Sequence, residues 1–316
     1  MNNYKLLGRA GEGAHGFVFR GMDLRTETLV ALGVPKNTMR EICALRALKS
    51  IHIVKLLEIT TMGSSVILVM EYLPWSLADV LKNTEKPISL SQIKTYMKMI
   101  LSGVNYMHQN HVMHRDMKPA NLLISNQGIL KIADFGLARI YSNDKPRQYS
   151  HQVATRWYRA PELLYGSRTY TPSVDMWSVG CILGEMINRQ PIFPGETDIE
   201  QLAIVLSTLG TPNEDTWPGL TQLPDYNKIA FTPNNGKRWS IVLPTADYVT
   251  LNLISKILIY DGEKRLTTKE ALNHKFFFEK PLPATLTDMP RLEEVKVNEH
   301  PWNFVEFDEI FYEINK

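Results

Sequence analysis

The stretch that decides the fold reads HRDMKPAN over residues 114–121, and DFG follows at residues 134–136 after the short apolar run from Ile129 to Ala133. The first stretch places a carboxylate, an ammonium group and a neutral amide within one loop. An amide oxygen and a carboxylate suit Mg²⁺ as ligands, and the neutral amide of Asn121 adds no repulsive charge. The pattern predicts a loop that orients a hydroxyl group, reaches a phosphate and helps to hold a metal ion.

A glycine-rich stretch near the N-terminus, GEGAHG at residues 11–16, supports binding of phosphate groups. Glycine has no β-carbon, so backbone amides there can approach phosphate oxygens closely. In a dinucleotide-binding fold such a stretch opens a helix, whereas the residues that follow here, FVFR at 17–20, are typical of a strand. This order favours a hairpin loop over phosphates, and a plain glycine-rich turn is the alternative.

Hydrophobic periodicity divides the chain into two parts. Strands are predicted over residues 4–7, 17–20, 28–32 and 66–71, with one helix among them on which Met39, Ile42, Leu45 and Leu48 form a single apolar face. Helices are predicted over residues 91–109, 172–188, 199–209 and 248–259. The expected fold class is α+β, with a small β-rich N-terminal lobe followed by a larger helical lobe.

Bulk composition narrows the class of protein. The 316 residues are 44% hydrophobic, enough for a large core, and the formal charge of +2 argues against a nucleic-acid partner. The two cysteines, Cys43 and Cys181, lie far apart and predict neither a disulfide framework nor a zinc site. Neither a signal-type leader nor a run of apolar residues long enough for membrane insertion is found in the sequence, so we expect an intracellular protein.

Three further motifs carry a resemblance to a known family. They are VATRWYRAPELLYG at residues 153–166, FPG at 193–195 and LGTP at 209–212. Together with the motifs above, they resemble the cyclin-dependent and mitogen-activated group of eukaryotic serine/threonine protein kinases, from about Tyr4 to Phe278. The resemblance implies a bilobal kinase domain over residues 4–278, with the N-lobe at about 4–73 and the C-lobe at about 74–278, and a tail over 279–316.

The family pattern implies transfer of the ATP γ-phosphoryl group to Ser or Thr with Mg²⁺. Asp116 and Lys118 would be catalytic, and Asn121 and Asp134 would bind metal. Met70 would be the gatekeeper beside the adenine, and Arg265 would pair with Glu162. The implied ATP-binding residues are Ala10, Gly11, Glu12, Gly13, Ala14, His15, Gly16, Phe17, Val18, Ala31, Glu71, Leu73 and Leu123.

The resemblance also implies how a peptide is selected. Arg159 would hold a backbone carbonyl and leave a small apolar pocket near Val153 for the residue after the target, which favours proline there. The expected partners are protein substrates with Ser/Thr-Pro sites. The resemblance also implies a location in the nucleus, the cytoplasm or the cilium.

Regulation is implied by a second group of positions. Ser150 stands where many relatives carry a phosphorylated threonine, and Arg40, Arg115 and Arg139 stand where relatives clamp that phosphate. An unmodified loop serine is the alternative. Ala14 and His15 replace the Thr and Tyr that carry inhibitory phosphates in cell-cycle relatives, which predicts that this brake is absent.

One position departs from the family pattern. Gly33 stands where the family has a lysine that pairs with the helix glutamate, here Glu41, and holds the ATP phosphates. The interval between the two residues is also short, so one deletion explains both anomalies. Lys36 is the nearest substitute in sequence, although it is expected past the end of the strand. The shortening also argues against a cyclin-like activator that grips this helix.

Three functional hypotheses remain. An ATP-dependent, proline-directed kinase is favoured by the complete set of Asp116, Lys118, Asn121 and Asp134, whereas a catalytically impaired scaffold is favoured by Gly33. A small-molecule kinase is disfavoured by the segment that runs from the DFG motif to the APE motif at residues 160–162. Measured phosphoryl transfer would discriminate between the first two.

Overall fold

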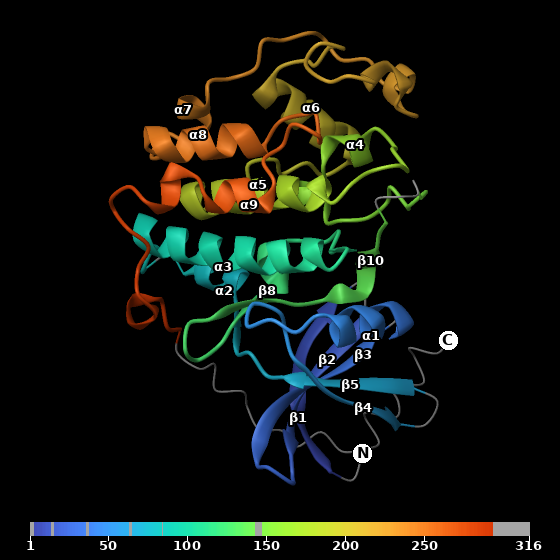
Figure 1. Ribbon diagram of the computed structural model, residues 1–316, viewed down its shortest axis with the longest axis vertical. Coiled ribbons are helices and arrows are strands. Elements are labelled where there is room, and N and C mark those ends of the chain that lie inside the picture. The colour runs from blue at the N-terminus through green and yellow to red at the C-terminus, as the bar shows by residue number, and fades with distance from the viewer. Residues whose placement is uncertain are drawn as a thin grey trace.

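The computed structural model describes residues 3–13, 16–35, 38–62, 65–83, 85–142 and 147–292. Two parts are evident in Figure 1, where blue strands gather at one end of the molecule and helices fill the other. The N-terminal sheet is antiparallel in the order β1-β2-β3-β5-β4. Its strands are β1 (Tyr4–Gly13), β2 (Gly16–Asp23), β3 (Thr28–Pro35), β4 (Leu56–Met62) and β5 (Ser65–Glu71). The predicted α+β fold class is confirmed, and β4 is an edge strand that the sequence pattern had not indicated.

Alternation along β3 assigns its two faces. Val30, Leu32 and Val34 are buried with Phe19 and Val69 in the core of the N-terminal lobe. Because successive side chains of a strand point to opposite faces, Ala31 and Gly33 turn to the other side, where both line the interlobe cleft. The strand therefore presents Gly33 to the cleft.

Helix α1 (Thr38–Ala47) follows β3 after a very short connection, and Glu41 lies in its first turn. The prediction of one apolar face from Met39 to Leu48 is wrong at Met39, which is 71% exposed, whereas Leu45 and Leu48 are buried. Steps of three residues at about 100° each fall about 60° short of a full turn. Three such steps carry Leu48 to the face opposite Met39.

The C-terminal lobe is mostly helical. Its helices are α2 (Leu77–Lys82), α3 (Leu90–Gln109), α4 (Pro161–Leu164), α5 (Ser173–Asn188), α6 (Asp198–Leu209), α7 (Trp239–Val242), α8 (Tyr248–Ile257) and α9 (Thr268–Leu272). Side-chain caps set several of the boundaries: Ser89 and Gln92 form a reciprocal capping box at the start of α3, which satisfies amide groups that have no partner inside the helix.

The remaining elements are short strands and 3₁₀ helices. They are β6 (Trp75–Ser76), β7 (Val112–Met113), β8 (Leu122–Ile124), β9 (Leu130–Ile132), β10 (Arg139–Ile140), η1 (Pro119–Asn121), η2 (Phe135–Leu137), η3 (Arg156–Tyr158), η4 (Leu220–Gln222), η5 (Tyr226–Lys228), η6 (Lys275–Phe277) and η7 (Leu286–Asp288). In the part of the chain that the structure describes, no helix combines the length and apolar character that crossing a bilayer requires.

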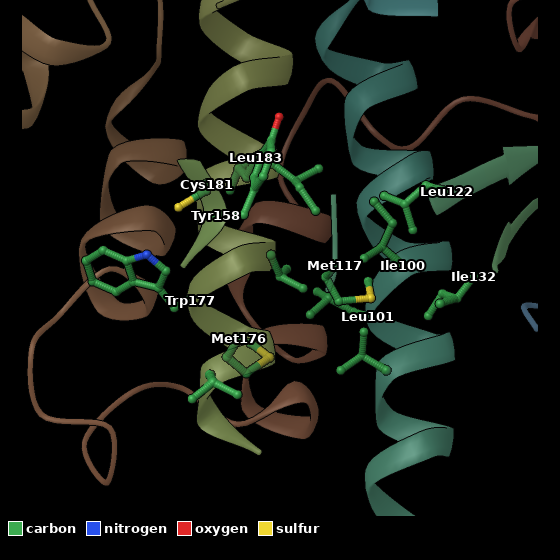
Figure 2. Close-up of a cluster of buried hydrophobic side chains, with 14 of the residues drawn as sticks. Ile100, Leu101, Met117, Leu122, Ile132, Tyr158, Met176, Trp177, Cys181 and Leu183 are labelled. Carbon is green, nitrogen blue, oxygen red and sulfur yellow. The ribbon is translucent and has the colours of Figure 1, made fainter. Parts of the chain in front are cut away.

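The core between α3 and α5 anchors the loop that carries Asp116. Figure 2 shows Met117, the next residue in the chain, among the apolar side chains of the two helices, near Ile100, Leu101 and Met176. Met117 is fully buried. Burial of such a side chain contributes roughly 1.5–3 kcal/mol, so the position of the loop is linked to the packing of the lobe.

The segment that follows η6 runs back across α3. The amide of Ala284 donates to the Ser91 carbonyl at 3.0 Å, and the Thr95 hydroxyl donates to the Ala284 carbonyl at 2.8 Å. Met289 is 3% exposed and packs against the turn at Gly128. This part of the tail is thus integrated into the core.

Candidate active site

A cleft of about 650 Å³ lies between the two lobes. Of the predicted ATP-binding residues, those that line it are Ala10, Gly16, Phe17, Val18, Ala31, Glu71, Leu73 and Leu123. Met70, the predicted gatekeeper, lines it as well. Gly11, Glu12 and Gly13 form the end of β1, whereas Ala14 and His15 lie outside the described residues. The structure thus brings predicted ATP-binding residues of both lobes together around one cleft.

The last glycine of the glycine-rich stretch is required by its conformation. Gly16 has a φ of +140°, and a β-carbon there would collide with the carbonyl oxygen of Val34. Only glycine avoids both problems. Gly16 itself lines the cleft at this close approach of β2 to β3.

Asp116 is held by a network of short hydrogen bonds. Its Oδ1 accepts from the Thr155 amide at 2.8 Å and from the Thr155 hydroxyl at 2.9 Å. Its Oδ2 accepts from Lys118 Nζ at 2.9 Å, and the same ammonium donates to Thr155 Oγ1 at 2.9 Å. A carboxylate fixed from both sides can orient a substrate hydroxyl, while the ammonium beside it can meet a transferring phosphate.

The backbone before Asp116 is fixed by a buried carboxylate. Asp175 accepts hydrogen bonds from the amides of His114 and Arg115, at 2.9 and 2.8 Å, and from His108 Nε2 at 2.9 Å. Burial raises the pKa of Asp175, but these hydrogen bonds and the nearby histidines outweigh it and hold the pKa below its ordinary value. Asp175 therefore stays ionised and locks the loop.

His114 links the catalytic loop to the segment that carries Asp134. The Asp116 amide donates to His114 Nδ1, so the proton is on Nε2, which donates to the Ala133 carbonyl at 2.9 Å. The imidazole also meets the ring of Phe135 edge to face, with centroids 5.0 Å apart. Because η2 in turn packs against α1, the loop, the DFG segment and the helix form one unit.

Asn121 and Asp134 both line the cleft and can serve as a metal site. Asn121 Nδ2 donates to the Asp116 carbonyl at 2.9 Å, which leaves the amide oxygen as the ligand atom. Asp134 has the left-handed φ of +61°, a conformation that costs energy and is common at functional sites. An amide oxygen and a carboxylate fit Mg²⁺, which in such a site supplies charge neutralisation to bound phosphates.

Gly33 lies where a lysine side chain would enter the cleft. It pairs with Val18 on β2 and with Leu68 on β5, and it lines the cleft together with Glu41. Glu41 is 8% exposed. Of the described residues that line the cleft, Arg9, Arg20 and Lys118 carry positive charge. Lys36, the substitute considered from the sequence, lies outside the described residues.

A second hollow, of about 690 Å³, adjoins Asp116 and Lys118. Arg159 Nε donates to the Val153 carbonyl at 2.8 Å and its Nη2 to the Ala154 carbonyl at 2.9 Å. Burial lowers the pKa of Arg159, which nevertheless forms an ion pair with Asp198 at 2.9 Å. Ala154 has a φ of +64°. The two carbonyls are therefore turned toward the guanidinium, and Val153 and Ala154 line the hollow.

Two predicted phosphate ligands, Arg115 and Arg40, lie close enough for their charges to act on the third, Arg139. Burial, followed by the charges of Arg115 and Arg40, lowers the pKa of Arg139. Arg115 donates to the Leu137 carbonyl and to the Tyr170 hydroxyl, each at 2.8 Å. Tyr170 in turn donates to the Ser150 carbonyl at 2.6 Å, so the exposed Ser150 is tethered beside the arginines.

The expected pair between Arg265 and Glu162 is confirmed. Two parallel hydrogen bonds of 2.7 Å join them, and the arginine side chain is fully buried. Such bidentate geometry fixes the end of the segment that begins at DFG. The pair therefore fixes the chain three positions after Arg159, which lines the second hollow.

Thr155 contacts the predicted catalytic residues, and the sequence interpretation did not assign it a role. It contacts both Asp116 and Lys118. Thr155 stands in the VATRWY stretch, five positions before the APE motif at residues 160–162. The contact joins residues almost forty positions apart, which the spacing of the motifs does not reveal.

Comparison with known proteins agrees with this geometry. The family model described as "Protein kinase domain" matches residues 4–277. Cyclin-dependent kinase 20 of Danio rerio is 49% identical over 301 residues, covering 92% of this chain and 88% of the relative. The human cyclin-dependent kinase 20 is 48% identical over 301 residues, with 92% and 87% covered.

A solved structure points the same way. A chain of the crystal structure of the yeast RNA Pol II CTD kinase CTDK-1 complex has a TM-score of 0.83 at 36% identity, covering 90% of this chain and 96% of that chain. Fold, cleft and family match define a protein kinase, and the chain belongs to the protein kinase family. Within that family it is a kinase of the cyclin-dependent type, similar to the cyclin-dependent kinases 20.

Proposed function

We propose that this chain transfers the γ-phosphoryl group of ATP, bound with Mg²⁺ between the lobes, to Ser or Thr in protein substrates. The network that joins Asp116, Lys118 and Thr155 carries the proposal. Phosphoryl transfer needs positioning and charge neutralisation more than covalent help. An oriented carboxylate with an ammonium beside it meets that need, with Asn121 and Asp134 as the metal ligands.

Proline after the target residue is the preference that the second hollow supports. Proline has no amide hydrogen, so it loses nothing where the enzyme offers no carbonyl as acceptor. The carbonyls of Val153 and Ala154 are engaged by Arg159. Any other residue at this peptide position would bury an amide without a partner, at a cost of about 1–3 kcal/mol.

Phosphorylation of Ser150 is the activating step that we propose. A phosphate carries close to two negative charges and can accept several charge-assisted hydrogen bonds. After burial, the charges of Arg115 and Arg40 lower the pKa of Arg139, and a dianion at Ser150 would relieve this repulsion. The cell-cycle role and the cyclin-type activator belong to the same proposal, because the relatives are named cyclin-dependent kinases.

Gly33 sets the expected level of activity. A lysine at this position would neutralise phosphate charge, and its absence predicts slow transfer or a chain that binds nucleotide without turnover. The impaired scaffold is therefore the second candidate function, favoured by the observation that Gly33 faces the cleft.

The experiment is Mg²⁺-dependent transfer of phosphate from ATP to a Ser-Pro peptide and to the matched Ser-Ala peptide. Asp116→Asn is the control variant, because it keeps the shape of the side chain but not its charge. We expect transfer to Ser-Pro that is lost in the control and weaker on Ser-Ala. Nucleotide binding without turnover in the phosphorylated chain would instead establish the scaffold.

A further inference from the structure

Residues 46–55, here called the basic loop, connect α1 to β4. They include Arg46, Lys49 and Lys55, all with exposed side chains, and no Asp or Glu. Among the described residues, no carboxylate forms an ion pair with any of the three. Ile51, which lies between them in the chain, is 61% exposed. The basic loop therefore offers positive charge and apolar surface to a partner that is both acidic and apolar.

Hydrogen bonds to β9 hold the basic loop against the C-terminal lobe. His52 Nδ1 donates to the Leu130 carbonyl at 3.0 Å. The Val54 amide donates to the Ile132 carbonyl, and the Ile132 amide donates to the His52 carbonyl, each at 2.9 Å. A surface that is already ordered loses little conformational freedom when a partner binds to it.

The described part of the chain ends close to the same loop. Met289 packs against the turn at Gly128, and the described residues end three positions after Met289. Gly128 lies two positions before Leu130, whose carbonyl accepts the hydrogen bond from His52. Residues 293–316 therefore begin within reach of the basic loop.

The composition of residues 293–316, here called the acidic tail, complements the basic loop. The acidic tail has seven Asp or Glu residues against two Lys, and its 24 residues include five aromatic ones. That aromatic share is about twice the 9% of the whole chain. Segments that stay solvated have few aromatic residues, whereas aromatic side chains supply much of the contact area at interfaces. The aromatic residues are Trp302, Phe304, Phe307, Phe311 and Tyr312, and the carboxylates among them are Glu306, Asp308 and Glu309.

We propose that the acidic tail docks on the basic loop of the same chain. Its carboxylates would pair with Arg46, Lys49 and Lys55, and its aromatic side chains would cover Ile51. An extended chain spans up to about 3.3 Å per residue, so the first ten residues of the acidic tail bridge up to about 33 Å. A short connection also gives an effective concentration in the millimolar range, at which several individually weak surface pairs are sufficient.

The test is hydrogen exchange of the full chain, read at the amides of residues 302–312. Exchange there should be at least about tenfold slower than in a synthetic peptide of the same residues. Arg46→Glu with Lys49→Glu should reduce this protection about threefold or more, because each change replaces an attraction with a repulsion. Protection that survives this double variant would overturn the proposal.

A matched control reverses one lysine and one arginine elsewhere. Lys237 and Arg238 are exposed and directly precede α7, at the end of the molecule away from the N-terminal lobe (Figure 1). Lys237→Glu with Arg238→Glu should leave the protection as in the original chain. An equal loss of protection in this control would mean that net charge alone acts on the acidic tail, which would also overturn the proposal.

A charge swap separates pairing from loss of fold. Glu306→Lys with Glu309→Lys should reduce the protection, and combining it with Arg46→Glu and Lys49→Glu should recover at least half of it. A damaged fold would not be repaired by two further substitutions in the acidic tail. Failure of the fourfold variant to recover protection, while both double variants remain folded, would contradict docking by these charges.

Docking within one chain is distinguished from docking between copies by carbodiimide cross-linking of an equal mixture of heavy-isotope-labelled and unlabelled chain. Links from Lys49 or Lys55 to carboxylates of the acidic tail should join peptides of one isotope only. Links that mix the isotopes would overturn the proposal in favour of a second copy as the partner. An acidic tail that exchanges as fast as the free peptide would also overturn it, and would leave the basic loop to a separate acidic protein.

Discussion

A β-carbon placed on Gly33 would lie 3.0 Å from the Cε methyl of Met70. The gatekeeper side chain thus occupies space beside the position where a lysine would enter the cleft. The contact is with the far end of a flexible thioether, which can move at small cost. Restoring a longer side chain at position 33 is therefore structurally feasible.

Gly33→Lys should raise kcat/KM for the Ser-Pro peptide about tenfold or more, because an ammonium returns beside the phosphates and near Glu41. The measurement is steady-state transfer with ATP and Mg²⁺. Gly33→Met is the control, since it displaces Met70 equally but brings no charge. Equal rates for the two variants would show that the missing charge is not what limits this chain.

Thr155→Ala should lower kcat about 10- to 100-fold with a small change in the KM for ATP. The variant removes the hydroxyl that joins Asp116 to Lys118, and small displacements of catalytic groups have effects of this size. Thr155→Ser keeps the hydroxyl and should remain within a few-fold of the original rate. A fully active Thr155→Ala chain would remove this residue from the site.

Glu162→Gln should destabilise the fold by about 3–5 kcal/mol, because it leaves the buried Arg265 without a charged partner. Urea unfolding measures the loss. The double variant Glu162→Leu with Arg265→Met should be more stable than the single variant, since it buries no uncompensated charge. A double variant that is less stable than the single one would contradict this account of the pair.

Arg25→Met should reduce stability near neutral pH and have little effect in strong acid. The Arg25 guanidinium lowers the pKa of Asp23, and the pKa of Glu58 is lowered by the Tyr4 hydroxyl and then by Arg25. Carboxyl groups with lowered pKa values stabilise the fold above their ordinary pKa, and the contribution is lost as pH falls.

Melting temperatures of the Arg25→Met variant and the original chain should therefore differ at about pH 7, and the difference should shrink as pH falls below the ordinary carboxyl pKa values of about 4. A difference that is constant over this range would mean that packing over the Tyr4 ring, 5.3 Å from the guanidinium, dominates instead.

Many of the site residues could be predicted from short sequence motifs, whereas the others are identified only by contacts in the folded chain. The stretch around Asp116 and the DFG segment were assigned because their residue types and order are rarely combined by chance. The departure at Gly33 was equally visible, and the register with Leu68 places it on the cleft side of the strand.

Contacts between distant segments could not be read from the chain. Thr155 meets Asp116 only after the intervening segment folds back, and Lys131 meets Glu71 across two lobes. Counting residues in steps of three also failed to assign the buried face of α1. A helical turn has 3.6 residues, so such steps move gradually around the helix, and Met39 was placed on the wrong face.

The family match ends at Phe277, but burial in the chain continues to Met289. A fragment cut where the resemblance stops would still be recognised as a kinase from its sequence. It would lack the segment that bonds to α3 through Ala284, and it would expose the apolar surface that Met289 covers beside Gly128. Exposed apolar surface favours self-association, so recombinant fragments that end with the family match should be aggregation-prone, because the packed part of the chain extends to Met289.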